Sequence, residues 1–247
     1  MNNQYFISIG KKERKAAIIL VLFHLFVMVI SSLITVSPPY GMDPEVFELL
    51  FNAVYQGVMI MIIALFMKEY MRRAWQNISA QSKGAVFGAV MLGILFIYAV
   101  SVIANIFSFS INGLGKIAVN QKMLQEFLGH YPFAIILLAV AGAFTEEVIY
   151  RGILFEFFYK AGQTASVLLT AFLFGFIHIL STIKMGDFNG ILDLILKLLP
   201  YFMMGLALAL EYVKYKNIWI NIFTHVLWNI IACLMSIVVM KFLPFMK

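Results

Sequence analysis

The chain has 247 residues, of which 63% are hydrophobic and only 12% are charged. A water-soluble protein of this size could not cover so much apolar side chain with polar surface, so the composition excludes a soluble enzyme and indicates a polytopic membrane protein. The net charge of +6 does not indicate a nucleic-acid-binding protein, because the Lys and Arg residues lie between the apolar segments rather than along one polar stripe.

Apolar blocks recur along the chain at the length of a membrane span. A hydrocarbon core about 30 Å thick needs about 20 apolar residues per helix. The predicted spans are residues 16–36, 47–67, 84–107, 132–159, 165–180, 192–212 and 218–242. The fourth is long enough to tilt or to break into two pieces, while Lys197 and Pro200 interrupt the sixth. We therefore expect one all-α transmembrane domain over residues 1–247, with about seven helices, or eight if residues 111–130 form a re-entrant segment.

The basic residues predict how the chain is oriented. In the predicted topology one side of the membrane carries Lys11, Lys12, Arg14, Lys15, Lys68, Arg72, Arg73, Lys83, Lys160, Lys214 and Lys216. The other side carries the acidic residues 37–48 and two loops of mixed charge with Lys116, Lys122, Lys184 and Asp187. By the positive-inside rule the first side is cytoplasmic. The sequence thus predicts an integral membrane protein with its amino terminus in the cytoplasm and its carboxyl terminus outside.

Three charged residues lie within the fourth predicted span, in the stretch "EEVIYR". An ionised side chain near the bilayer centre costs about 2.5 to 3.5 kcal/mol on insertion scales, so such charges must be paired or must line a hydrated cavity. Glu147 and Arg151 are four residues apart and face the same way on a helix, in the favourable order for an ion pair. Glu146 is rotated by about 100° from Glu147 and lies outside that pair on an ideal helix. The predicted ion pair therefore accounts for Glu147 and Arg151 but leaves the charge of Glu146 unexplained.

Two later spans add histidines. The stretch "FGFIH" places Phe174 one turn before His178 in the fifth span, and "HVLWN" places His225 and Asn229 on one face of the seventh. A single histidine within a membrane is more often a helix-packing residue than a catalyst, and a buried network that only locks helices together is the structural alternative for the whole set. Counted at about 1.5 Å per residue, Glu146 and these polar residues fall within about two helical turns in depth, which permits one shared site.

A glutamate, two histidines and an asparagine can together hydrolyse an amide. A carboxylate in a low-dielectric pocket can act as a general base toward water, which is the role predicted for Glu146. A neutral His178 can hydrogen-bond the same water, while His225 and Asn229 can direct two donors at the oxygen that becomes negative in a tetrahedral intermediate.

The three motifs, in this order on successive late helices, resemble those of the CPBP family, which comprises type II CAAX prenyl proteases and bacteriocin-processing (Abi) enzymes. Every motif position is filled, by Glu146, Glu147, Arg151, Phe174, His178, His225 and Asn229. The resemblance implies cleavage of a peptide bond near the cytoplasmic membrane face. It implies that the first Glu and the first His activate water and that the second His and the Asn form the oxyanion hole. The motif-bearing core is predicted over about residues 132–242.

The sequence leaves two alternatives open. Glu146, His178 and His225 also match a zinc site with an open fourth position, but the chain has no HExxH motif, so we favour a glutamate mechanism without a cofactor. The family also contains members whose role is immunity or regulation, so the second function is a non-proteolytic regulator, scaffold or bacteriocin-immunity protein. A transporter is disfavoured, since no inverted repeat is visible.

The sequence also suggests the source and the substrate class. Short cytoplasmic loops and the lack of a soluble domain favour a bacterial cell membrane. We therefore expect the partners to be the lipid bilayer and a hydrophobic, amphipathic or lipidated peptide, such as a bacteriocin or quorum-sensing precursor, with no nucleic acid.

Overall fold

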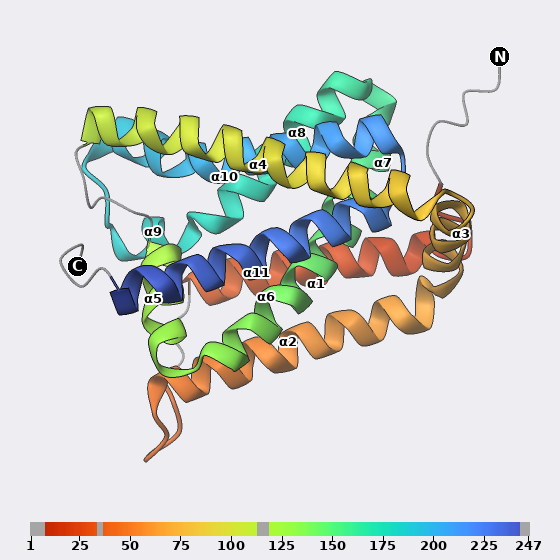
Figure 1. The fold of residues 1–247 in the computed structure, drawn as a ribbon. Coiled ribbons are helices and arrows are strands. Elements are labelled where there is room, and N and C mark those ends of the chain that lie inside the picture. Colours follow the sequence, from red (N-terminus) through yellow and green to blue (C-terminus); the bar gives the residue numbers. More distant parts are fainter. Residues whose placement is uncertain (1–7, 34–36, 113–118, 243–247) are drawn as a thin grey trace.

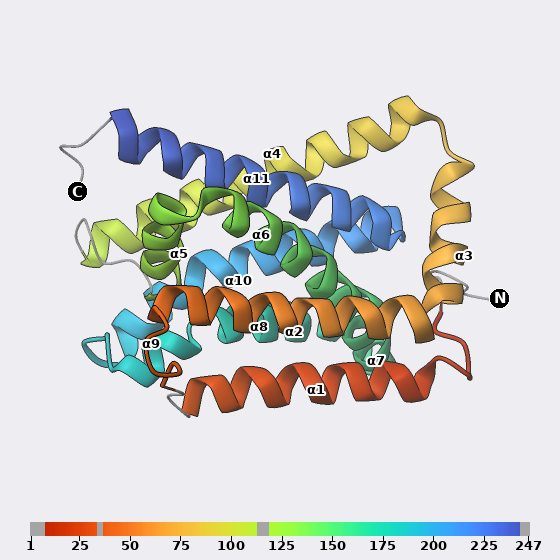
Figure 2. The same ribbon diagram turned by 90° about the horizontal axis from the view of Figure 1, so that it is seen from below.

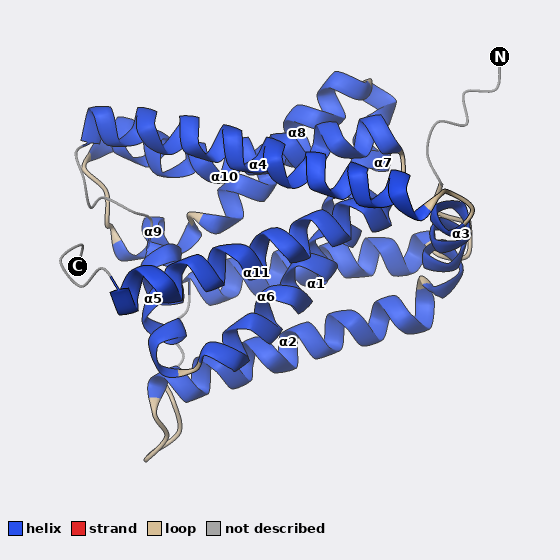
Figure 3. Cartoon of the chain, in the orientation of Figure 1, coloured by secondary structure: helices blue, strands red, loops and turns tan. Residues whose placement is uncertain are grey.

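The computed structural model describes residues 8–33, 37–112 and 119–242, and every regular element within these ranges is a helix (Figure 3). The longer helices are α1 (Arg14–Leu33), α2 (Pro44–Phe66), α4 (Lys83–Asn112), α6 (Pro132–Glu147), α8 (Gln163–His178), α10 (Gly190–Tyr215) and α11 (Ile218–Phe242). The shorter ones are α3 (Lys68–Ser79), α5 (Val119–His130), α7 (Phe155–Phe158), α9 (Leu180–Met185), the π-helix η1 (Val148–Leu154) and the 3₁₀-helix η2 (Tyr159–Ala161). The predicted all-α class is confirmed.

Within the described residues, six helical stretches are long and apolar enough to cross a membrane: Arg14–Ser31, Pro44–Phe66, Lys83–Ile111, Pro132–Ala161, Gly190–Tyr215 and Ile218–Val238. The remaining predicted span forms α8, an apolar helix of 16 residues. Large apolar side chains such as Leu22, Phe26 and Phe87 are more than half exposed, as expected for surfaces that face lipid tails. The chain is therefore an integral membrane protein built as a polytopic helix bundle.

Two predicted details of the spans differ from the structure. Lys197 and Pro200 do not interrupt α10, in which Lys197 is buried and lies 3.6 Å from the Asp193 carboxylate one turn earlier. The stretch between the second and third spans, to which no helix was assigned, forms α3, whose Tyr70 and Ala74 are buried against the bundle. The predicted re-entrant segment is not tested, because residues 113–118 lie outside the described residues and α5 covers only the later part.

The helices run between two opposite ends of the molecule. In Figures 1 and 2, α3 and α7 lie at one end and α5 and α9 at the other, and α1 and α2 run side by side between them. α1 begins at the α3 end, whereas α11 ends beside α5 (Figure 2). Hydrogen bonds join several chain segments at the α3 end, including Arg73 to Glu13 at 2.8 Å and Asn217 to the Ala74 carbonyl at 2.9 Å. The predicted basic loops after α2, α7 and α10 therefore meet at one end of the bundle.

α10 forms the centre of the motif-bearing half, because it packs against both α8 and α4. Glycines allow α8 and α10 to approach closely. A Cβ atom on Gly175 would lie 2.8 Å from the backbone nitrogen of Phe202, and one on Gly205 would lie 3.0 Å from the carbonyl oxygen of Ala171. Real Cβ atoms essentially never approach another atom within 2.8 Å, and 3.0 Å is tighter than most real contacts, so a larger residue at either position would require the two helices to shift.

The predicted fourth span is continuous but changes its winding next to the two glutamates. α6 ends at Glu147, and the following seven residues form η1, in which every residue from Val148 to Leu154 is buried. A π-helix has i→i+5 hydrogen bonds and therefore more residues per turn than an α-helix, and such segments are frequent at functional sites. The prediction assumed regular α-helical geometry here and did not anticipate this change.

Candidate active site

The ion pair predicted between Glu147 and Arg151 is present. Arg151 Nη1 donates to Glu147 Oε1 at 2.9 Å, and both side chains are completely buried. Arg151 Nη2 donates to the carbonyl oxygen of Gly205 on α10 at 2.9 Å. The guanidinium thus neutralises the carboxylate and also fixes η1 against α10, which is the arrangement that makes a buried charge tolerable.

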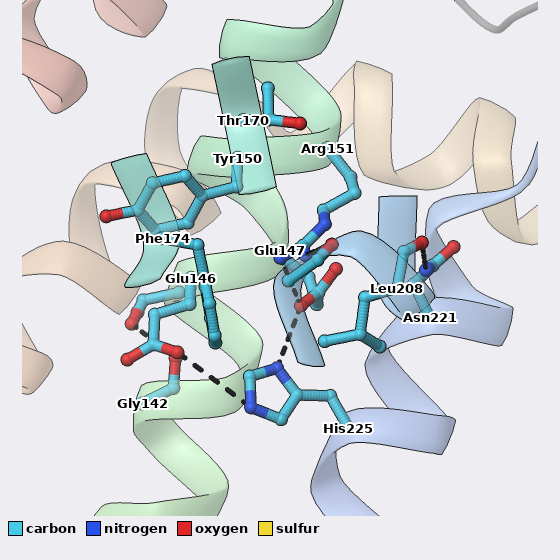
Figure 4. Close-up of polar contacts among 12 residues, drawn as sticks. Gly142, Glu146, Glu147, Tyr150, Arg151, Thr170, Phe174, Leu208, Asn221 and His225 are labelled. Carbon is cyan, nitrogen blue, oxygen red and sulfur yellow. Dashed lines mark hydrogen bonds and ion pairs between the residues drawn. The ribbon is translucent and has the colours of Figure 1, made fainter. Parts of the chain in front are cut away.

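His225 on α11 lies between the two glutamates. Its Nδ1 is 2.8 Å from Glu147 Oε1, and its Nε2 is 3.9 Å from Glu146 Oε2 (Figure 4). Because Glu147 is paired with Arg151, the carboxylate accepts and Nδ1–H donates, so Nε2 is the nitrogen directed to Glu146. Glu146 retains 23% side-chain exposure, whereas Glu147 has none. The two adjacent carboxylates therefore differ in role: Glu147 binds Arg151 and His225, whereas Glu146 remains accessible.

The ring of Phe174 on α8 lies between the two histidines and the arginine of the site. Its ring centroid is 4.6 Å from that of His178 and 5.8 Å from that of His225, and the Arg151 guanidinium lies over it at 5.0 Å. The ring is fully buried. Phe174 thus sets the spacing of the two histidines and provides a cation–π contact for the buried arginine.

His178 is the last residue of α8, and its orientation follows from its hydrogen bond. Nδ1 lies 2.7 Å from the carbonyl oxygen of Phe174, which can only accept, so Nδ1 carries a hydrogen. The ring also stacks on Tyr201 of α10, with a centroid distance of 4.8 Å. In the neutral form, Nε2 is then the unprotonated nitrogen and can accept a hydrogen bond from water.

Asn229 lies one turn beyond His225 on α11. Its Nδ2 donates to the carbonyl oxygen of Ala139 at 3.2 Å, and Ala139 is about two turns before Glu146 on α6. The structure thus attaches this amide to α6 through one N–H, and an asparagine amide has a second N–H to donate.

The alternative zinc set is not assembled in this arrangement. Within the described ranges, no three His, Cys, Asp or Glu side chains are grouped closely enough to hold a metal ion. His225 Nδ1 is occupied by Glu147, and Nε2 lies 3.9 Å from Glu146 Oε2.

Polar residues on the first two helices also reach the neighbourhood of the site, although no sequence motif marks them. His24 of α1 contacts the hydroxyl groups of both Tyr55 and Tyr150, and Gln56 of α2 accepts a hydrogen bond from Thr145 at 2.7 Å. A histidine and a glutamine within apolar spans were the available signal, because polar residues in a membrane usually face the bundle interior. They match no motif, which is why the search by motif passed over them.

The fold and the site define a polytopic membrane protein in which a partly accessible glutamate lies beside a histidine that is held by a buried Glu–Arg pair. Residues 128–231 match the family model described as type II CAAX prenyl endopeptidase, Rce1-like. This range contains all seven residues of the three motifs. Residues 128–231 are thus similar to the type II CAAX prenyl endopeptidase family, which is consistent with the CPBP resemblance of the three motifs.

Two curated bacterial proteins are similar to the chain. The "UPF0177 protein YvdC" of Lactococcus lactis subsp. lactis (strain IL1403) is 29% identical over 150 residues, which cover 60% of this chain and 52% of that protein. The "Putative membrane peptidase YdiL" of Bacillus subtilis (strain 168) is 24% identical over 179 residues, which cover 72% and 68%. The chain thus matches only about half of the first relative's length. No solved structure matches the chain.

Proposed function

We propose that the protein is an intramembrane endopeptidase that hydrolyses a peptide bond with water activated by Glu146 and His178, without a metal. The observation that carries this proposal is the different surroundings of the two adjacent glutamates. Glu147 is engaged by Arg151 and His225, whereas Glu146 is the accessible carboxylate beside His225 Nε2. A general base must be able to reach water and a substrate, and only Glu146 meets that condition.

The hydrolysis follows from these positions. Glu146 takes one proton from the water, while His178 Nε2 accepts a hydrogen bond from the other water hydrogen and orients it. The oxygen forms a bond to the peptide carbonyl carbon, and the carbonyl electron pair moves onto its oxygen. When the C–N bond breaks, the proton on Glu146 passes to the leaving nitrogen. The products are a carboxylic acid and an amine, and Glu146 is restored as a carboxylate.

Two hydrogen-bond donors on α11 would stabilise the oxyanion of the tetrahedral intermediate. With a proton on Nε2, His225 is a donor on the Glu146 side of its ring, and Glu147 balances its charge through Nδ1. Asn229 can add its second N–H from one turn further along the same helix. Donors that are fixed before the reaction stabilise a developing charge without reorganisation. Glu147 and Arg151 act through His225 and η1, so they are positioning residues.

The substrate is a membrane-associated peptide cut near the cytoplasmic face. The end that gathers the basic loops after α2, α7 and α10 would be cytoplasmic by the positive-inside rule, with the amino terminus inside and the carboxyl terminus outside. The lack of a large polar domain among the described residues favours a short hydrophobic or amphipathic peptide, such as a bacteriocin or quorum-sensing precursor, in a bacterial cell membrane.

Cleavage by protein reconstituted into liposomes tests this function. A mixture of membrane-anchored peptides with varied sequences serves as the probe, and mass spectrometry identifies the products. We expect cleavage by the wild type and none by Glu146→Gln, which preserves size and removes the base. Folding of both proteins is checked by thermal unfolding in detergent. Peptide binding without Glu146-dependent cleavage would overturn the proposal in favour of a regulator or immunity protein.

A further inference from the structure

A turn at residues 10–13, just before α1, is held against the start of α3. A 3.0 Å hydrogen bond from the N–H of Glu13 to the carbonyl oxygen of Gly10 closes the turn. The buried Glu13 carboxylate accepts hydrogen bonds from the N–H of Tyr70 and from Arg73 Nη2, both on α3. The N–H of Gly10 also donates to this carboxylate, at 2.8 Å. These contacts of one acidic residue fix the position of the turn beside α3.

The lysines around this turn have no acidic partner. Lys11 and Lys12 lie in the turn and Lys15 lies in the first turn of α1, and all three side chains are exposed. In the part of the chain that the structure describes, none of them forms an ion pair. Three acidic residues at this end each accept a hydrogen bond from another group: Glu13, Glu69 and Glu156. The lysines are thus left as a positively charged surface, which attracts an anion.

An apolar groove begins one helical turn from Lys15. It runs along α1 from Ile19 to Ile30, has a volume of about 710 Å³ and is lined by apolar side chains of this helix. Two of them, Leu22 and Phe26, are 61% and 62% exposed, and α1 forms one edge of the bundle (Figure 2). Residues four apart share one face of a helix, so Lys15 lies at the end of the groove marked by Ile19. A charged surface and an apolar groove are therefore continuous on α1.

This combination matches one class of ligand. At about 1.5 Å per residue the groove is about 16 Å long, which is about half of a hydrocarbon core about 30 Å thick and is the depth that one acyl chain fills. Lysines next to the apolar part of a membrane protein attract the anionic headgroups of lipids. A free phosphate would contact the lysines alone, and an uncharged lipid would use the groove alone. An anionic phospholipid contacts both.

We propose that the start of α1 and the turn before it bind an anionic phospholipid. Its phosphate lies at Lys11, Lys12 and Lys15, and one acyl chain lies in the groove that begins at Ile19. The buried Glu13 keeps the turn in place and is neutralised by an arginine of α3, so that it does not cancel the charge of the lysines. The site lies outside residues 128–231, which match the family model, and it does not depend on turnover.

Lipid binding by the full chain in neutral detergent tests the headgroup contacts. Native mass spectrometry gives the dissociation constants of phosphatidylglycerol, which is anionic, and of phosphatidylcholine, which has no net charge. The wild type should bind phosphatidylglycerol more tightly. Each lysine beside an anionic headgroup strengthens binding about fivefold, so Lys12→Gln/Lys15→Gln should weaken the binding of phosphatidylglycerol about thirtyfold and leave that of phosphatidylcholine unchanged.

The matched control removes the same charge at the same end of the bundle. Lys83 and Lys214 are exposed residues of α4 and α10, and Lys83→Gln/Lys214→Gln should leave the binding of both lipids unchanged. Equal weakening by the two double variants would show a general attraction without a site and would overturn the proposal. Equal affinities of the wild type for the two lipids would overturn it as well, and this comparison needs no variant.

A second pair of variants tests the groove. Leu22→Trp fills it with a larger side chain, whereas Ile18→Trp adds the same ring at a position that is 59% exposed and does not line the groove. We expect Leu22→Trp to lower the affinity for phosphatidylglycerol and Ile18→Trp to leave it unchanged, with folding of both checked by thermal unfolding. An unchanged affinity in Leu22→Trp would overturn the placement of the acyl chain.

Two further measurements separate the lipid from other occupants of this surface. Glycerol 3-phosphate carries the phosphate without acyl chains, and at equal concentration it should not displace phosphatidylglycerol. Displacement would assign the lysines to a soluble phosphate and overturn the lipid. The size of the protein in detergent is measured on the same samples. A dimer that Leu22→Trp separates, with lipid binding unaltered, would assign the groove to a second copy of the chain and likewise overturn the proposal.

Discussion

Glu147 accepts a hydrogen bond from His225 Nδ1 at 2.8 Å, which joins the end of α6 to α11 in the middle of the bundle. The same carboxylate oxygen accepts from Arg151 Nη1 at 2.9 Å. One oxygen atom thus orients a site histidine and balances a buried cation. The consequence is that Glu147 and Arg151 support both the stability of the bundle and the geometry of the site.

Arg151→Ala should lower the free energy of unfolding by about 3 to 5 kcal/mol, because it leaves Glu147 as a buried carboxylate without its cation. Glu146→Gln should leave stability near that of the wild type, since Glu146 is partly exposed and outside this pair. Thermal or denaturant unfolding in detergent measures both. The division of roles between the two glutamates would be rejected by an equal loss of stability in the two variants.

Asn229→Ala should reduce kcat by about a hundredfold to a thousandfold, equivalent to about 2.7 to 4 kcal/mol, with little change in KM, if its second N–H stabilises the oxyanion. The variant also loses the hydrogen bond to Ala139, so its folded fraction must be measured on the same sample. Stability lowered by about 1 kcal/mol with near-normal kcat per folded molecule would show that Asn229 only packs α11 against α6.

The sequence was sufficient for those parts of the site that depend on spacing within one helix. Glu147 and Arg151 could be paired because residues four apart face each other, and the membrane spans could be recognised from their length and hydropathy. Contacts between helices could not be predicted in this way. His225 binds Glu147 and Asn229 binds Ala139 because of how α11 lies against α6, and no local pattern encodes that relation.

The contribution of α1 and α2 was missed for a different reason. His24, Tyr55 and Gln56 are single polar residues in apolar helices, with no motif around them. The contacts of His24 with Tyr150 and of Gln56 with Thr145 join residues about a hundred positions apart. Sequence alone could mark these residues as unusual in a membrane span, but it could not give their partners.

Removal of metal should leave activity unchanged. The protein purified in detergent should contain far less than one equivalent of zinc by elemental analysis, and its cleavage rate should be the same before and after treatment with a chelator. This expectation follows from the arrangement of Glu146, His178 and His225, which are not gathered as a ligand set. Stoichiometric zinc whose removal abolishes cleavage, and whose return restores it, would replace the glutamate mechanism by a metal-dependent one.

The contact between His130 and Glu45 should depend on pH. The 2.7 Å hydrogen bond to Glu45, together with the charge of that carboxylate, raises the pKa of His130 above its ordinary value of 6.5. Because the pKa of the folded protein is raised, the stabilising contact between α2 and α5 is complete below pH 6.5 and is lost as the pH rises through the raised pKa. NMR titration of His130 measures this. Glu45→Gln should return the pKa toward 6.5, and an unchanged pKa would contradict the assignment.

Because η1 is a π-helix, the fourth span does not keep one α-helical register along its whole length. The residues before it, including Glu146, follow the angular register of α6, and the residues after it follow that of α7, with the wider turn absorbing the difference. Because a wider turn holds more residues, a π-helical segment carries one residue more than an α-helix of nearly the same total rotation. Deleting one residue between Val148 and Leu154 would therefore let the segment close into an ordinary α-helix while the parts before and after it keep nearly the same relative register. The residues within the turn, including Arg151, would change their positions, so chimaeras that exchange α6 or α7 between relatives must preserve the number of residues in this turn to keep Arg151 on Glu147.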